Sequence, residues 1–293
     1  MNKNHFFSLW VGKQPSIYEI LCYLSFVRND QSFTLYTYEK FQLPDEIDQV
    51  TAENIVPRSE FENFKGGYAE FSDYFRFKAL SILNPRAIWV DGDILCLGQA
   101  FPKDAFLYGL ETKNIVGSAI VSFPSDSLIL EEVNNLLPSQ VGLEWGKTGP
   151  ILLTSVLRKH DMFNSAKRQH VFYPIPGRRI NLFLDPEKRD AAVSLITDSS
   201  TIHLWSQMFA VFQVPKDRLP PEGSLLASMF QIFFPEVTGQ RLDDAWLRKW
   251  TKYYKKKQFL SFLNNFLLKM RIDLNRSTIV VKLRAKLEEA MYR

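Results

Sequence analysis

The chain has 293 residues, of which 46% are hydrophobic, so it can build a sizeable core and is not expected to be disordered. It has no uninterrupted apolar run of about 18 residues, and the apolar run near its start is too short for a signal peptide. We therefore expect a soluble cytoplasmic protein. Of the 36 basic residues 13 lie from Trp246 onward, against three of the 32 acidic ones, so an acidic body precedes a basic tail suited to an anionic partner.

The first 40 residues predict a parallel α/β unit. An apolar run ending at Gly12 is typical of a buried strand, helical spacing follows from Ile17 to Val27 with Ser16 as a cap, and residues 32–39 form a β-branched and aromatic run. Strand, helix and strand in this order imply a right-handed parallel crossover. Residues 40–67 are polar and broken by prolines and glycines, so we expect a surface connection with one helical turn.

Helical spacing returns over residues 71–83 and ends before Pro85, because the residue before a proline avoids the helical region. The apolar run that follows predicts a central parallel strand, buried on both faces, over residues 87–90. We expect the α/β body over residues 1–219 and a basic helical extension over residues 220–293. The apolar surroundings of both cysteines predict buried free thiols at Cys22 and Cys96.

Two aspartates, Asp91 and Asp93, follow this buried strand directly. Ligands of open α/β sheets bind outside the carboxyl ends of the strands, so the position itself indicates a functional site. If the strand continued, the two carboxylates would point to one face about 6 to 7 Å apart, and Gly92 would permit a bend or a close approach. Carboxylates of this kind suit Mn²⁺ or Mg²⁺ bridging to a diphosphate; the alternative is an acidic exposed turn.

Asp73 and Arg76 lie on the predicted helix before that strand. Their spacing of three residues places them on one helix face, where they could pair or both reach a sugar and its phosphate. The alternative is a surface ion pair that contributes little stability.

The stretches LWVG, FSDYFRFKAL, WVDGD, WGKTGPILLT, FYPI and HLW occur in this order between residues 6 and 207. In these stretches and their order the chain resembles the retaining glycosyltransferases with a D-x-D sugar-binding region and an α1,4-galactosyltransferase-type C-terminal region. This group contains globotriaosylceramide synthase and many bacterial capsule and lipopolysaccharide enzymes. It is similar, more distantly, to the glucosylating domain of the large clostridial toxins. The resemblance implies a GT-A fold, which is a Rossmann-like α/β domain. It also implies transfer of a hexose (galactose, glucose or N-acetylhexosamine) from a UDP-sugar, with retention of configuration, to a glycan or lipid-linked glycan acceptor.

The resemblance also implies residue roles. Trp10 would stack on uracil, and Asp91 would reach the ribose and sugar. An S-D-x-x-R motif that contacts the donor is matched by Ser72, Asp73 and Arg76. Asp93 would ligate Mn²⁺ or Mg²⁺ directly, with Asp91 and His203 completing the metal site. The implied catalytic residues are Asp73, Arg76 and Asp91, and Trp145, Gly149 and Pro150 could form part of the acceptor side. Plain core packing of Trp10 or His203, and an ordinary helix start at Pro150, remain alternatives.

The chain departs from the family pattern in two places. Asn84, Pro85 and Arg86 replace the usual glycine pair before the D-x-D strand, and more than eighty residues follow the HLW stretch. Two rival functions therefore stay open. One is a non-catalytic glycan-binding or scaffold protein on the same fold. The other is an aspartate-nucleophile phosphatase, whose D-x-D usually stands nearer the start of the chain and is followed by a small β-branched residue where this chain has Leu95.

The basic segment 246–293 combines lysines with apolar residues at helical spacing. This pattern suits a helix on an anionic membrane surface, which would place the protein at the inner face of the cytoplasmic membrane; the alternative is a helix packed on the catalytic domain. No nucleic-acid-binding motif accompanies the basic residues, so a nucleic-acid partner is not expected.

Overall fold

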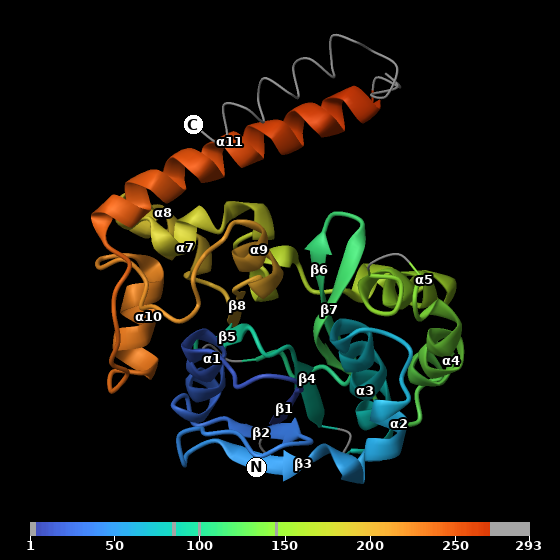
Figure 1. The fold of residues 1–293 in the computed structure, drawn as a ribbon. Coiled ribbons are helices and arrows are strands. Elements are labelled where there is room, and N and C mark those ends of the chain that lie inside the picture. Colours follow the sequence, from blue (N-terminus) through green and yellow to red (C-terminus); the bar gives the residue numbers. More distant parts are fainter. Residues whose placement is uncertain (1–3, 84–85, 99–100, 144–145, 270–293) are drawn as a thin grey trace. The chain divides into compact units, whose positions relative to one another are not determined.

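The computed structural model describes residues 4–83, 86–98, 101–143 and 146–269 (Figure 1). The chain separates into two compact units, residues 1–242 and residues 243–293. The first unit therefore extends past the expected boundary at residue 219, because α10 (Leu225–Phe233) packs on α1 (Ile17–Val27) and α7 (Asn181–Leu184). The assignment of catalysis to residues 1–219 stays a prediction.

The first unit is built on a six-stranded sheet of order β3-β2-β1-β4-β7-β6. The first four of these strands along the chain are parallel, whereas β7 is antiparallel to both β4 and β6. A separate antiparallel pair joins β5 to β8. The strands are β1 (His5–Trp10), β2 (Ser32–Thr37), β3 (Asp48–Thr51), β4 (Ala87–Val90), β5 (Ile94–Cys96), β6 (Leu107–Thr112), β7 (Ile115–Ser122) and β8 (Thr201–His203).

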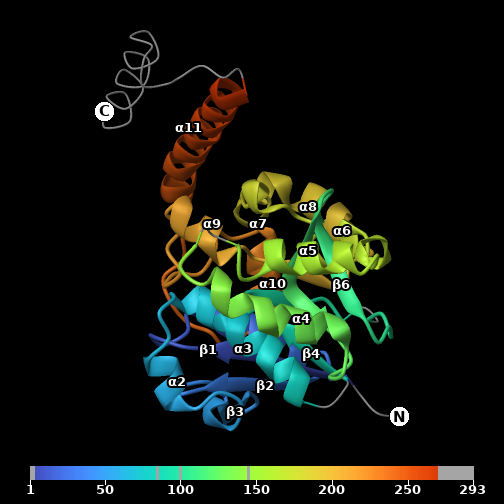
Figure 2. The ribbon, with the colours of Figure 1, turned by 90° about the vertical axis from the view of Figure 1, so that its right-hand side faces the viewer.

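Helices cover both faces of the sheet, as Figures 1 and 2 show. α1 packs against β2 and β5 on one face, while α3 and α5 pack against β1, β4 and β7 on the other, with α4 between α3 and α5. Among the remaining helices, α6 packs against β8, while α7, α8 and α10 pack on one another. The other helices of the unit are α2 (Arg58–Glu62), α3 (Tyr68–Ile82), α4 (Leu128–Leu136), α5 (Pro150–Lys159), α6 (Gln169–Phe172), α8 (Arg189–Ile196) and α9 (Ser206–Val211).

The predicted β-α-β unit is confirmed, and its local chemistry explains it. Ser16 caps α1 by accepting from the backbone N–H of Tyr18, and Glu19 reaches back to the Ser16 backbone, which forms a capping box. β1 alternates between the two layers: Phe6 packs against Phe26 on the α1 side, and Phe7 packs against Trp89 on the other. Both cysteines are buried free thiols, as expected.

Two expectations about the sheet were incomplete. The polar connection 40–67 contains β3, a four-residue edge strand that is too short and too polar to show a strand pattern. β4 is buried on both faces, as predicted, yet it is parallel to β1 and antiparallel to β7. The departure Asn84–Pro85 lies outside the described residues.

The second unit contains α11 (Asp244–Lys269). Trp246, Trp250 and Tyr254 stack along one side of this helix, with ring centroids 5.5 Å and 5.1 Å apart. No helix within the described residues is long and apolar enough to cross a membrane. Residues 270–293, which belong to the predicted basic segment, lie outside the described residues.

Candidate functional site

The two aspartates lie in a tight turn between β4 and β5, and not along a continued strand. The backbone N–H of Asp91 donates to Ala119 on β7 at 2.8 Å, and the N–H of Ile94 closes the turn by donating to the Asp91 carbonyl at 3.0 Å. The expected strand spacing is therefore wrong, because the chain bends where the sheet ends. A Cβ at position 92 would lie 3.0 Å from the hydroxyl oxygen of Tyr23 and 3.4 Å from the ring of Trp10, so glycine fits this crowded turn.

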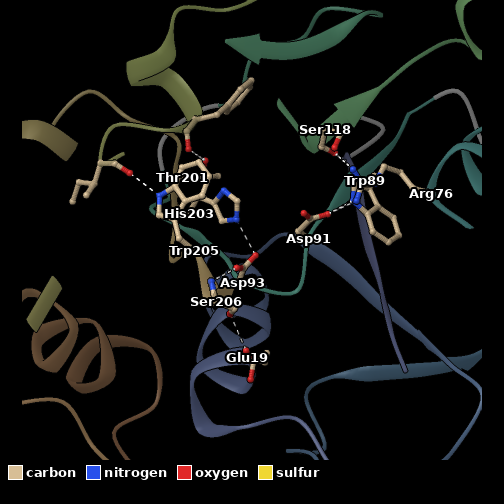
Figure 3. A network of polar contacts seen from close by, with 12 residues as sticks. Glu19, Arg76, Trp89, Asp91, Asp93, Ser118, Thr201, His203, Trp205 and Ser206 are labelled. Atoms are coloured by element: carbon tan, nitrogen blue, oxygen red, sulfur yellow. Dashed lines mark hydrogen bonds and ion pairs between the residues drawn. The ribbon is translucent and has the colours of Figure 1, made fainter. Parts of the chain in front are cut away.

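The β5–β8 pair brings His203 to this turn from more than a hundred residues away along the chain. Ile94 is paired with His203, and the N–H of Leu204 donates to the Asp93 carbonyl at 2.9 Å. His203 Nε2 consequently lies 3.1 Å from Asp93 Oδ1 (Figure 3). One potential ligand atom from each of Asp91, Asp93 and His203 lies within 4.8 Å of the others. The three predicted metal ligands thus meet at one point.

The chemistry and spacing of these groups fit a divalent cation. Two ligands at right angles on an octahedral cation, with bonds of about 2.1 Å, lie about 3 Å apart, which agrees with the separation of His203 Nε2 and Asp93 Oδ1. Two carboxylates and an imidazole suit Mn²⁺, and the carboxylates suit Mg²⁺. Asp91 uses Oδ1 for protein contacts, and within the described residues nothing donates to its Oδ2, which leaves that oxygen for a cation.

The imidazole of His203 is held by stacking. The Trp205 ring lies parallel to it, with centroids 3.9 Å apart and an interplanar angle of 26°, and Trp205 Nε1 donates to the Ile175 carbonyl at 2.7 Å. Trp205 itself has a left-handed backbone with φ of 59°. Non-glycine residues seldom adopt this conformation, and it is found most often where a functional site imposes it. Here it turns the chain so that the next N–H, that of Ser206, donates to Asp93 Oδ2 at 2.7 Å.

Asp93 and His203 form a mutually charged pair in the metal-free protein. Burial alone would raise the pKa of Asp93, but the charge and hydrogen bond of His203, together with hydrogen bonds from Ser206, outweigh burial and lower it. Burial would likewise lower the pKa of His203, and the negative charges of Asp93, Asp91 and Glu111 with the Asp93 hydrogen bond raise it. Each partner therefore favours the ionised form of the other.

This pair predicts a pH window for the stability of the metal-free protein. The lowered pKa of Asp93 stabilises the folded protein above about pH 4, and this stability is lost as the pH falls through the folded-state pKa of Asp93. The raised pKa of His203 stabilises the folded protein below about pH 6.5, and this stability is lost as the pH rises through the folded-state pKa of His203. We expect the wild type to exceed Asp93→Asn most in free energy of unfolding between these two values. Urea denaturation in EDTA from pH 3 to 9 measures the free energy of unfolding of the two proteins. A difference between the two proteins that does not vary with pH would contradict the pairing.

Arg76 on α3 is a buried bridge between two acids. Its Nη2 lies 2.8 Å from Asp91 Oδ1 and 3.1 Å from Asp73 Oδ1, and its Nη1 donates to the Ser118 carbonyl at 2.6 Å. Its side chain is 3% exposed, so the alternative of a surface ion pair is wrong. Trp89 Nε1 also donates to Asp91 Oδ1, at 2.7 Å (Figure 3). Asp91 is therefore oriented from two sides, and a direct contact of Arg76 with the donor stays a prediction.

The WGKTGP stretch packs against Asp73. Thr148 Oγ1 donates to Asp73 Oδ2 at 2.7 Å, and a Cβ at Gly149 would stand 2.7 Å and 2.8 Å from the two carboxylate oxygens, so a side chain at this position would displace Asp73. Burial raises the pKa of Asp73, although the Arg76 charge and the Thr148 hydrogen bond act against it. Pro150 begins α5, as predicted. The acceptor role of these residues stays a prediction, and Trp145 lies outside the described residues.

The predicted uracil platform, Trp10, ends β1 beside the aspartate turn. The residue is only partly buried, its ring lies 3.4 Å from where a Cβ at position 92 would stand, and its Nε1 donates to the Lys13 carbonyl at 2.7 Å. It is therefore not an ordinary core residue, although stacking on a base stays a prediction. Ser72 is partly exposed on α3, and its donor contact likewise stays a prediction.

Several residues that shape the site were not among the candidates from the sequence. Ser206, Trp89 and Thr148 each donate to one of the site carboxylates. Glu111 on β6 is a further acid: burial raises its pKa, the charge of His203 lowers it, and that of Asp91 raises it. The spacing of WVD could have indicated that Trp89 and Asp91 share a side, but the other contacts depend on the folded chain.

A Rossmann-like sheet whose central strand ends in an Asp-x-Asp turn, with a histidine brought back to that turn, defines a GT-A domain. Residues 126–219 match the family model described as "Alpha 1,4-glycosyltransferase conserved region". These residues are thus similar to a conserved region of α1,4-glycosyltransferases, which supports a glycosyltransferase activity. The matched segment includes Thr148, Gly149 and His203, whereas Asp91 and Asp93 precede it. No curated protein matches the chain.

Proposed function

We propose that this protein is a metal-dependent glycosyltransferase that moves a hexose (galactose, glucose or N-acetylhexosamine) from a UDP-sugar to a glycan or lipid-linked glycan acceptor, with retention of configuration. Surface polysaccharide or lipopolysaccharide synthesis is the proposed setting. The observation that carries the proposal is the convergence of Asp91, Asp93 and His203 at the end of β4. The matched region includes His203 and supports a glycosyltransferase activity.

The proposed mechanism assigns a task to each described group. Mn²⁺ or Mg²⁺ held by Asp93, Asp91 and His203 would supply Lewis-acid stabilisation of the negative charge that develops on the leaving diphosphate. Arg76 and Trp89 hold Asp91 Oδ1, which would leave the other carboxylate oxygen for the cation and the ribose side of the donor. Trp10 offers a partly exposed aromatic face beside the turn, suited to the uracil base.

Retention of configuration requires either a covalent intermediate or attack by the acceptor on the same face as the leaving group. None of the residues that we place at the turn is marked as a nucleophile, because Asp73 and Asp91 are both engaged by Arg76. We favour same-face attack, in which the leaving phosphate helps to accept the proton of the acceptor hydroxyl.

Release of UDP from a panel of UDP-sugars, with and without Mn²⁺, tests this proposal and separates it from its rivals. We expect Mn²⁺-dependent UDP release from one donor, accelerated by the correct acceptor. Release of inorganic phosphate from phosphate esters, without UDP release, would indicate the phosphatase. Binding of glycans with neither product would indicate the non-catalytic protein.

We also propose that α11 contacts an anionic membrane surface, where lipid-linked acceptors are found. Lys252, Lys255, Phe259 and Phe262 have spacings that place them on one side of the helix, opposite the stacked aromatic residues. Phe259 is 57% exposed and Phe262 is 66% exposed. Exposed aromatic residues beside lysines suit a helix that lies in a membrane interface.

Vesicle flotation of the full chain measures this contact. We expect flotation with vesicles containing phosphatidylglycerol, little with pure phosphatidylcholine, and loss of binding at high salt. The double variant Phe259→Ser and Phe262→Ser should float several-fold less. Ile232→Ser, which changes an exposed apolar residue on α10, is the matched control and should float like the wild type. Equal flotation of the double variant and the control would contradict the membrane contact.

A further inference from the structure

Glu19 is a buried acid on α1 with two distinct sets of partners. Its side chain is 2% exposed. Oε2 accepts from the Ser16 backbone N–H at 3.0 Å and from Ser16 Oγ at 2.6 Å, which completes the cap of α1. Oε1 accepts from Lys216 Nζ and from Ser206 Oγ, the latter at 3.2 Å. The capping box accounts for the hydrogen bonds of Oε2, whereas the contacts of Oε1 with Lys216 and Ser206 lie outside it.

Ser206 joins the Glu19–Lys216 ion pair, in which only Glu19 is buried, to the candidate metal site. Its Oγ contacts both members of the pair, since Lys216 Nζ also donates to it at 3.1 Å. Its backbone N–H donates to Asp93 Oδ2 at 2.7 Å, and Figure 3 shows Glu19, Ser206 and Asp93 in this order. One residue therefore connects the Glu19–Lys216 pair to the aspartate that we assign as the direct metal ligand.

This connection determines how the Asp93 carboxylate is oriented. With Oδ2 held by the Ser206 N–H, Oδ1 faces His203 Nε2 at 3.1 Å. Ser206 begins α9 directly after the left-handed Trp205, so the position of its N–H depends on where this short helix starts. Ser206 Oγ donates to Glu19 Oε1 and accepts from Lys216 Nζ, and these two hydrogen bonds anchor that point.

We infer that Glu19 and Lys216 are positioning residues for the metal site. By anchoring Ser206, they hold the Asp93 carboxylate in the orientation that a divalent cation requires. Residues that orient a metal ligand from outside commonly contribute about 10- to 100-fold to metal affinity. The inference rests on the proposed metal dependence and adds residues that come from α1 and from the segment after α9, outside the D-x-D turn itself.

Measurement of Mn²⁺ binding to the full chain tests the inference. The electron paramagnetic resonance signal reports the concentration of free Mn²⁺. Ser206→Ala keeps the N–H but removes both anchoring bonds, and it should weaken Mn²⁺ binding about 10-fold with little change in Tm. Lys216→Met should weaken it as well. Ser16→Ala is the matched control, because it removes a bond to the other oxygen of Glu19; it should lower Tm and leave the Kd for Mn²⁺ unchanged.

The outcomes separate this inference from the proposed function. If the wild type binds Mn²⁺ and Ser206→Ala binds it equally well, the positioning role is wrong while the metal site stands. If the wild type itself binds no Mn²⁺, the proposed metal dependence falls and the inference falls with it. If Ser16→Ala weakens Mn²⁺ binding as much as Ser206→Ala, the effect comes from general destabilisation of α1, and the positioning role is again overturned.

Discussion

Asp93→Asn should abolish Mn²⁺-dependent release of UDP, with a loss of at least about a hundredfold, because the amide removes the negative charge of the residue proposed to ligate the metal directly. The fold should remain. The amide oxygen of Asn can still accept from the Ser206 N–H, and the backbone contacts of the turn do not involve the side chain. Mn²⁺ binding should weaken in parallel with activity.

Asp104→Asn is a suitable control for this variant. Asp104 forms a surface ion pair with Lys167 at 2.8 Å, and we place neither residue in the site. The control should retain wild-type turnover and Mn²⁺ binding, because exposed ion pairs contribute little. Normal turnover by Asp93→Asn, measured beside this control over the same donor panel, would refute the metal-dependent mechanism.

Arg76→Met should destabilise the protein by about 3 to 5 kcal/mol and remove activity, because one buried guanidinium serves Asp73, Asp91 and the Ser118 carbonyl. Methionine fills similar space but leaves two carboxylates close together without a positive charge. Arg76→Lys should recover part of the stability but little activity, because one ammonium group lacks the planar fork that meets several acceptors. Urea denaturation and UDP release measure the two effects separately.

A second substitution checks whether the two unpaired carboxylates cause the loss of stability. Adding Asp73→Asn to Arg76→Met removes one of the two unpaired charges and should restore part of the lost stability. Arg58→Met is the matched control: Arg58 also contacts two acids, Glu39 and Glu53, but it does so at the surface and should matter little. Equal stability of Arg76→Met and the wild type would contradict the bridging role.

Much of the architecture could be predicted from local patterns. The capped α1, the flanking strands and the buried run of β4 follow from residue spacing, because each of these elements buries a continuous apolar face. Edge strand β3 escaped prediction because a polar edge strand lacks such a face. The antiparallel partner of β4 escaped prediction because strand order depends on contacts between distant segments.

In the candidate site, too, local spacing predicts some contacts and not others. Asp73 and Arg76 could be paired from their helical spacing, and that pairing is confirmed. The geometry of Asp91 and Asp93 could not be read from their spacing, because a turn and a strand with the same residues place the carboxylates differently. The spacing rule applies only while the strand continues, and here it ends at Val90.

The side chains of the candidate site follow from the sequence: two aspartates after a buried strand, an acid and an arginine on the preceding helix, and a histidine near the end of the acidic body. Their contacts with one another depend on the fold. The β5–β8 pairing brings His203 to Asp93, and the start of α9 directs the Ser206 N–H to the same carboxylate. These contacts join segments more than a hundred residues apart, and such segments come together only because the intervening helices and strands are buried.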